Sequence, residues 1–112
     1  MPFVYKVGVI YRITCGSKSY IGQTRRDAET RFREHQAHAR RGEEGHLYTA
    51  MRVESSSVEV LEACNDTALN RRERAWIKAM GTMVPLGYNI TPGGNQTRRQ
   101  NREWAKRAQC YM

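Results

Sequence analysis

The first quarter of the chain alternates between apolar and polar positions in the way that paired strands require. Residues 4–14 read VYKVGVIYRIT, rich in β-branched and aromatic side chains, and residues 19–24 read SYIGQT. The intervening residues 15–18, CGSK, have the composition of a tight turn. This order predicts a strand, a turn and a second strand, which together form an antiparallel hairpin.

The register of this hairpin depends on the length of its turn. A loop of two or four residues pairs Thr14 with Ser19 and Ile13 with Tyr20. Tyr11 and Tyr20 then lie diagonally adjacent on one face, whereas a loop of odd length would place them on opposite faces. Two tyrosines on a shared face are therefore expected only if the loop is even.

A helical period replaces the alternation from Asp27 to about Arg41, a stretch without glycine or proline. Asp27 can cap the first turn, and Gly42 follows the last. The apolar stripe of this helix contains Ala28, Phe32 and Ala39, His35 continues the stripe, and Arg31 borders it. Two polar side chains are therefore expected to point toward the interior.

The middle of the chain predicts a short helix, a strand and a longer helix. HLYTAM follows a linker of glycine and glutamate and indicates one helical turn; residues 58–63, VEVLEA, indicate a third strand, with residues 55–57 as a loop before it. A second long helix is predicted over residues 68–80, with caps from residues 65–67 and Gly81 at its end. Its apolar stripe contains Leu69, Trp76, Ile77 and Met80.

Glu73 is the polar exception within that stripe. It lies four residues after Leu69 and four before Ile77. A carboxylate facing the core is costly unless a cation or hydrogen-bond donors accompany it. Glu73 is therefore a candidate metal ligand, and its alternative role is a buried ion pair with Arg31.

The last third of the chain changes in character at residue 95. Residues 86–94 predict a short extended stretch that ends in a turn, with Asn89 placed to hydrogen-bond neighbouring groups. Residues 95–112 are basic and are expected to form a helix, a tail or the start of a linker. The fold class is α+β: a hairpin and a third strand form one sheet flanked by helices, in a single domain of residues 1–94.

The chain is strongly basic, which predicts binding to a polyanion such as DNA. Its 112 residues carry a formal net charge of +8, and residues 98–112 alone hold five Lys or Arg against one Glu. The alternative is a well-hydrated surface without a partner. The candidate contacts to nucleic acid are Arg25, Arg26, Arg40, Arg41, Arg98 and Arg99.

The three cysteines indicate a reducing environment. Cys15, Cys64 and Cys110 are widely spaced and contain no C-x-x-C pair, which argues against a disulfide framework and against a thiolate zinc site. No apolar run approaches the roughly 20 residues of a membrane span, and the N-terminus lacks the order of a signal peptide. The sequence therefore predicts a cytoplasmic protein without a membrane partner.

Five blocks of the sequence resemble the GIY-YIG nuclease family, in the family's order. They are VIYRIT, SYIGQT, RFREH, ERAWI and GYNITPGG, and the resemblance spans about residues 7–94. One departure is visible, because Val9 stands where the family name implies glycine, although Gly8 precedes it. The resemblance is strongest to the catalytic domains of phage and intron homing endonucleases, which implies a phage or bacterial host.

The resemblance implies an active site made of Tyr11, Tyr20, Arg31, His35, Glu73 and Asn89. Phosphodiester hydrolysis needs positive charge near phosphorus, a deprotonated water and a stabilised leaving oxygen. Glu73 would hold one Mg²⁺ or Mn²⁺ ion, and Arg31 would hold a phosphate oxygen. Asn89 is expected to order the site.

Tyr11 and His35 compete for the role of general base. Reference pKa values favour histidine, at about 6.5 against about 10 for tyrosine, whereas the family resemblance favours Tyr11. The expected function is a metal-dependent DNA endonuclease, and its alternative is a binding or regulatory module of the same fold that no longer cuts. A separate targeting domain, or a second copy for double-strand cleavage, is compatible with either.

Overall fold

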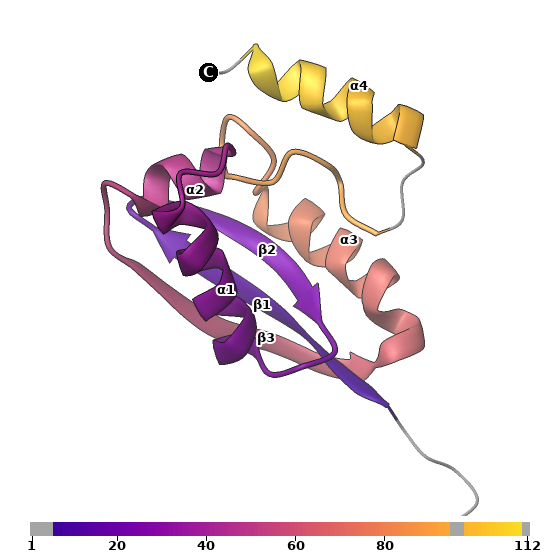
Figure 1. Cartoon of the computed structure of the whole chain (residues 1–112). Helices are drawn as coiled ribbons and strands as arrows, with labels where there is room; N and C mark the ends of the chain where they lie inside the picture. The colour runs from indigo at the N-terminus through magenta and orange to yellow at the C-terminus, as the bar shows by residue number, and fades with distance from the viewer. Residues whose placement is uncertain (1–5, 95–97, 111–112) are drawn as a thin grey trace, which may run out of the picture.

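The computed structural model describes residues 6–94 and 98–110, and within them a three-stranded antiparallel sheet with strand order β2-β1-β3 (Figure 1). The strands are β1 (Val7–Cys15), β2 (Lys18–Thr24) and β3 (Ser56–Asn65). The helices are α1 (Ala28–Arg40), α2 (His46–Met51), α3 (Leu69–Met80) and α4 (Arg98–Gln109). The α+β class and the single sheet are confirmed. Residues 4 and 5 of the expected first strand lie outside the described residues.

The hairpin has the even loop on which the tyrosine pair depends. Cys15 pairs with Lys18 across a two-residue turn, and Ile13 pairs with Tyr20. Gly16 in this turn has φ +64°, a conformation that glycine adopts without steric cost. The rings of Tyr11 and Tyr20 are 6.4 Å apart between centroids, so the predicted shared face is confirmed.

β3 is longer than the sequence indicates. It begins at Ser56, so the prediction of a loop over residues 55–57 is wrong for its last two positions. The reason is pairing with β1, because Cys15 lies opposite Ser56 and Val7 lies opposite Asn65. Serine has a weak intrinsic preference for strands, and the neighbouring strand overrides it.

α1 has its predicted N-terminal cap, whereas no side chain caps α3 at Ala68, and Asn65 caps the 3₁₀ turn before it. The Asp27 side chain accepts a hydrogen bond from the backbone N–H of Thr30 at the start of α1. The predicted interior stripe is also confirmed, since Ala28, Phe32, His35 and Ala39 are all buried. α3 begins at Leu69 after a single turn of 3₁₀-helix over Asp66–Ala68, and Gly81 ends it in the left-handed conformation.

The helices cover the sheet from both sides (Figure 1). On one face, Tyr11 and Ile13 pack with Phe32 of α1 and Leu47 of α2. On the other face, Ile10 and Ile21 pack with Leu69 and Ile77 of α3. The two small cores follow from the alternation along β1, because successive residues face opposite sides.

Residues 81–94, which follow α3, consist mainly of turns and bends. Residues 86–94 form no strand, and a single bridge joins Met83 to Asn89, so the expected extended stretch is wrong. α4 contacts the rest of the chain, because the His46 ring lies 3.2 Å from the backbone oxygen of Ala108. In residues 6–94 and 98–110 no helix has the length and apolar content needed to cross a membrane.

Candidate active site

A hydrogen-bonded chain of aromatic side chains runs from the sheet to α2. The Tyr11 hydroxyl lies 2.8 Å from Nε2 of His35, and the Tyr48 hydroxyl lies 3.2 Å from Nδ1 of the same ring. Tyr20 presents its ring edge to His35, with 5.4 Å between the centroids. Because both imidazole nitrogens have hydroxyl partners, the orientation of His35 is set before any substrate arrives.

Gly22 leaves the space that the Tyr11 hydroxyl occupies. The two residues are partners across the hairpin. A Cβ added to Gly22 would lie 2.4 Å from the hydroxyl oxygen of Tyr11 and 2.5 Å from its Cζ. Non-bonded atoms cannot approach so closely, so any side chain at this position would displace the ring. The glycine of the YIG block therefore positions the first tyrosine.

Both tyrosines are protonated at neutral pH. Burial raises the pKa of Tyr11 far above its usual value, the neighbouring Tyr20 and Glu73 add to the rise, and the adjacent Arg31 guanidinium opposes it. Burial also raises the pKa of Tyr20 to about 12, again with a contribution from Glu73 and an opposing one from Arg31. Arg31 and Glu73 thus act on both hydroxyls. The site is therefore made of residues from β1, β2, α1 and α3.

His35 is neutral at physiological pH. Burial lowers its pKa to about 4, and the positive charge of Arg31 contributes to this fall. A neutral imidazole carries one N–H and one lone pair, so it can accept a proton at one nitrogen and donate from the other. His35 can therefore take a proton from Tyr11 while it is held by Tyr48.

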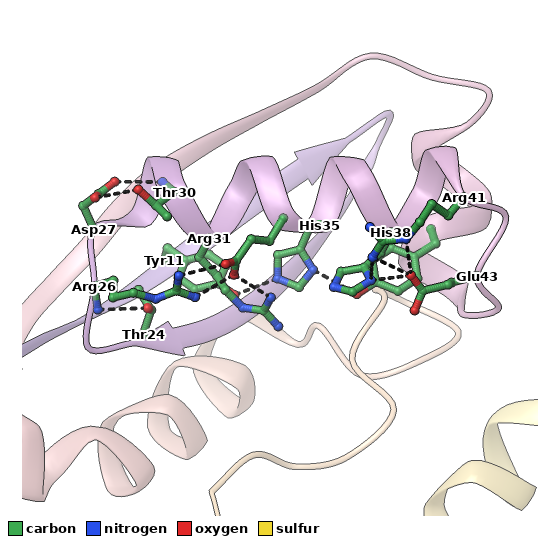
Figure 2. A network of polar contacts seen from close by, with 12 residues as sticks. Tyr11, Thr24, Arg26, Asp27, Thr30, Arg31, His35, His38, Arg41 and Glu43 are labelled. Carbon is green, nitrogen blue, oxygen red and sulfur yellow. Dashed lines mark hydrogen bonds and ion pairs between the residues drawn. The ribbon is translucent and has the colours of Figure 1, made fainter.

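Arg31 is held by a carboxylate on its own helix (Figure 2). Its Nη1 donates to Glu34 at 3.1 Å, and the Arg26 guanidinium donates to both oxygens of that carboxylate at 2.8 and 2.6 Å. The hydrogen bonds from Arg26 lower the pKa of Glu34 to about 2, so it stays charged. A guanidinium has five N–H donors, which leaves Arg31 able to donate to a phosphate oxygen.

Glu73 reaches the site from α3 and has amide donors as its partners. Its Oε1 accepts a hydrogen bond from the backbone N–H of Gly94 at 2.7 Å, and the Gln23 amide lies beside it. Burial raises its pKa. Within residues 6–94 and 98–110 no Lys, Arg or His forms an ion pair with Glu73, and Arg31 pairs with Glu34 instead. The alternative of an Arg31 to Glu73 ion pair is therefore wrong.

The donor set around Glu73 fits a hard cation held by a single carboxylate. No group of three or more His, Cys, Asp or Glu side chains clusters in the described part of the chain. A zinc site of four protein ligands is therefore not built there. Mg²⁺ takes one or two carboxylates and completes its shell with water and substrate phosphate, which suits a half-buried carboxylate without a cationic partner.

Asn89 anchors the loop after α3 to the edge of β2. Its Oδ1 accepts from the Ile21 N–H at 2.9 Å and from the Thr82 hydroxyl at 2.7 Å, and its Nδ2 donates to the Ile21 oxygen at 2.9 Å. These bonds occupy both ends of the amide. Asn89 thus imitates a neighbouring strand and orders the segment between α3 and Gly94.

The six arginines expected to contact nucleic acid lie at both ends of α1 and at the start of α4. Four of them have carboxylate partners: Arg25 with Asp66, Arg26 with Glu34, Arg41 with Glu43, and Arg99 with Glu103. Arg40 is exposed, and the side chain of Arg98 lies outside the described residues. Their contact with DNA stays a prediction.

Sequence reasoning missed two residues of this site, Tyr48 and Glu34. The sequence could have identified Glu34, because it follows Arg31 by three residues and residues three apart on a helix are neighbours. Tyr48 had no local signal, since it lies on a helix of six residues and meets His35 only through the packing of α2 against α1. The role of Gly22 also had no local signal, because it depends on the Tyr11 ring that packs against it.

Three comparisons with known proteins bear on this geometry. The profile that describes the GIY-YIG catalytic domain matches residues 7–89. Among solved structures, a glutamate-to-alanine mutant of the catalytic domain of intron endonuclease I-TevI is 22% identical, with a TM-score of 0.69 over 80% of this chain and 99% of that one. The catalytic domain of homing endonuclease I-TevI is 24% identical, with a TM-score of 0.65 over 75% and 98%. No curated protein matches.

Proposed function

Because the chain belongs to the GIY-YIG catalytic domain family, we propose that it is a metal-dependent endonuclease that hydrolyses phosphodiester bonds of DNA. The observation that carries this proposal is the meeting of four groups in one place. Tyr11 is hydrogen-bonded to His35, and the charges of Arg31 and Glu73 both act on its hydroxyl. These are the groups that the expected chemistry requires.

Tyr11 and His35 act as one base in this proposal. Tyr11 alone would have to exist as tyrosinate, which burial disfavours. Instead, the attacking water gives its proton to the Tyr11 oxygen while the Tyr11 proton moves to Nε2 of His35, 2.8 Å away. The water oxygen forms a bond to phosphorus, the bond to the leaving oxygen breaks, and that oxygen takes a proton from solvent.

Tyr48 completes this pair on the far side of the imidazole. The Tyr48 hydroxyl lies 3.2 Å from Nδ1 of His35, and in the tautomer that this step requires Nδ1–H donates to that hydroxyl while Nε2 keeps its lone pair. The imidazolium that forms during the reaction keeps this partner. Its positive charge is opposed by Arg31, and the negative charge gained at phosphorus offsets that repulsion.

Glu73 is the residue that would hold one divalent cation, Mg²⁺ or Mn²⁺. Such an ion supplies positive charge that stabilises the negative charge at phosphorus. Arg31 would hold a phosphate oxygen from the α1 side, with Glu34 fixing the direction of its guanidinium. The phosphate would then lie between α1 and α3, above the two tyrosines.

Nicking of supercoiled plasmid DNA tests this function. The protein is expected to produce open circles with Mg²⁺ or Mn²⁺ and none with EDTA. Glu73→Ala should abolish nicking, whereas Glu29→Ala, which removes an exposed carboxylate on α1, should not. Intact protein that binds DNA but nicks it with neither metal would contradict the proposal and would favour a binding module of the same fold.

A further inference from the structure

A small pocket opens directly beside the candidate active site. Its volume is about 220 Å³, and it lies between the connection from α1 to α2 and the loop that follows α3. Its walls include Tyr20, His35 and Tyr48 from the site, together with Tyr88, Ile90 and Glu44. Anything bound in this pocket would therefore touch the groups that surround the reacting phosphate.

Two of the tyrosines that line the pocket have their hydroxyls in hydrogen bonds. The Tyr88 hydroxyl donates to the backbone oxygen of Cys15 at 2.7 Å, and the Tyr48 hydroxyl is bonded to His35. With these polar ends occupied, the two side chains present apolar aromatic surface to an occupant. Aromatic surface of this kind stacks on planar rings, and every nucleic-acid base has such a ring.

The charge of the lining excludes a phosphate as the occupant. None of the described residues that line the pocket is a lysine or an arginine, and Glu44 contributes a negative charge at its rim. A separate pocket of about 380 Å³ at the far end of α1 has the opposite character, because Arg40 and Arg52 line it. The pocket beside the active site is thus suited to a neutral ring.

The size of the pocket restricts the occupant to one small ring system. Pockets that take drug-sized ligands measure roughly 300 to 1,000 Å³, and this one is smaller. Because Tyr20 and His35 of the site line the pocket, a nucleotide whose phosphate is in the site has its own base within reach. A single base is therefore the occupant that satisfies size, charge and position together.

We propose that this pocket binds one unstacked base of the cleaved strand, next to the phosphate held by Arg31. The inference rests on the proposed function and specifies its substrate. A base inside a continuous duplex must be unpaired and unstacked before it can enter such a pocket, and that costs free energy. The preferred substrate is therefore DNA with an unpaired nucleotide beside the cut, such as a single-nucleotide bulge.

Photocrosslinking tests the pocket without any need for cleavage. A duplex with one bulged 5-iodouracil is bound in EDTA, irradiated and digested, and the crosslinked peptides are identified by mass spectrometry. Crosslinks are expected at Tyr48 or Tyr88. Ile90→Trp, which fills the pocket, should reduce them by at least about 5-fold, since a filled pocket cannot stack a base. Leu86→Trp should leave them unchanged.

The two tryptophan variants form a matched pair. Ile90 is 38% exposed and lines the pocket, whereas Leu86 is 76% exposed on the same loop and does not. Both should fold, and thermal melting checks this. Equal crosslinking in both variants, equal crosslinking of a fully paired duplex, or crosslinks confined to residues outside the pocket would each overturn the proposal.

Cleavage rates provide the second measurement. With Mg²⁺, the protein should cut the bulged duplex about 10-fold faster than a paired duplex of the same sequence, because the unstacking cost is already met. Ile90→Trp should bring the ratio close to one, and Leu86→Trp should keep it. If the protein cuts no DNA at all, the proposed function fails, and the crosslinking result still decides whether the pocket binds a base.

Discussion

The polar groups on the two faces of the sheet differ in the partners that they have. On the face covered by α1 and α2, His35 is hydrogen-bonded to both Tyr11 and Tyr48, and Arg31 is paired with Glu34. On the α3 side, Glu73 meets amide donors and forms no ion pair among the described residues, although the charge of Arg74 acts on it. The charges on one side of the site are paired in the free protein, whereas the carboxylate on the other side has no ion-pair partner.

This difference predicts that the α1 side positions the reacting groups and that Glu73 binds a cation. Groups that satisfy each other are already oriented, so the α1 side can hold a base and a phosphate donor in fixed geometry. A half-buried carboxylate without a cation is costly for the folded chain, and a bound cation removes that cost. Changes on the α1 side should therefore lower stability and activity together, and changes at Glu73 should lower activity alone.

The largest expected effect is that of Glu73→Gln. Glutamine keeps an acceptor for the Gly94 N–H but loses the charge that the cation requires. The nicking rate should fall by at least about 100-fold. The melting temperature should stay the same or rise, because burial disfavours the charged form. A clear fall in melting temperature would mean that the two sides do not differ as described.

Acid should destabilise the α1 side through His35. Its folded pKa of about 4 lies below the unfolded value of about 6.5, so between these values the unfolded chain binds a proton that the folded chain does not. His35 should therefore remove about 3 kcal/mol from the free energy of unfolding as the pH falls from 7 to 4.

Urea unfolding at several pH values measures this loss. His35→Gln should flatten the dependence of stability on pH over this window, whatever its effect on absolute stability. His46→Gln, at a partly exposed position on α2, is the control and should keep the slope. A slope that survives His35→Gln would assign the acid sensitivity to other groups.

Gly22→Ala should displace Tyr11 from its position. A Cβ at 2.4 Å from the hydroxyl forces the ring to move, and a shift of about 1 Å can reduce the rate by about 100-fold. Overpacking should also lower stability by about 1 to 3 kcal/mol. In a double-mutant cycle with Tyr11→Phe, part of this loss should disappear, since the clashing oxygen is absent. Strict additivity would contradict the proposed clash.

Tyr48→Phe should have a smaller effect on the same side. It removes the partner of Nδ1 in a buried imidazole, which should lower the free energy of unfolding by about 1 kcal/mol. The single-turnover rate should fall by about 10-fold because Nδ1 loses the partner that orients the imidazole. The DNA concentration at half-maximal rate should not change. A change confined to that concentration would place Tyr48 in binding.

The smallest effect is expected from the exposed basic residues of α4. Arg99→Gln together with Arg102→Gln should weaken DNA binding at low salt and leave the chemical step unchanged. The slope of log K against log salt should become shallower by about 0.9 for each phosphate that the variant no longer neutralises. Arg71→Gln with Lys78→Gln, at exposed positions on α3, is the matched control. Equal slopes in both pairs would show that α4 has no special part in binding.

Local signals in the sequence were sufficient for the hairpin and for most helix ends. The sequence limited the hairpin to two registers, and the structure showed the even loop that places Tyr11 and Tyr20 on one face. Asp27 and Gly81 act within one turn of their helices. The alternation along β1 also assigns each side chain to one of two cores. Each of these features depends on neighbours only a few residues away, which a linear pattern records.

Contacts between distant segments were decided only by the tertiary structure. Helical spacing places Glu34 within reach of Arg31, but only the structure showed that Arg31 forms no ion pair with Glu73 on α3. Nothing in the sequence indicated that Tyr48 would meet His35, or that β3 would extend to Ser56 opposite Cys15. The pocket beside Tyr20 likewise exists only where separate segments meet. Such contacts depend on how helices and strands pack, and packing energy is a property of the assembled fold rather than of any local pattern.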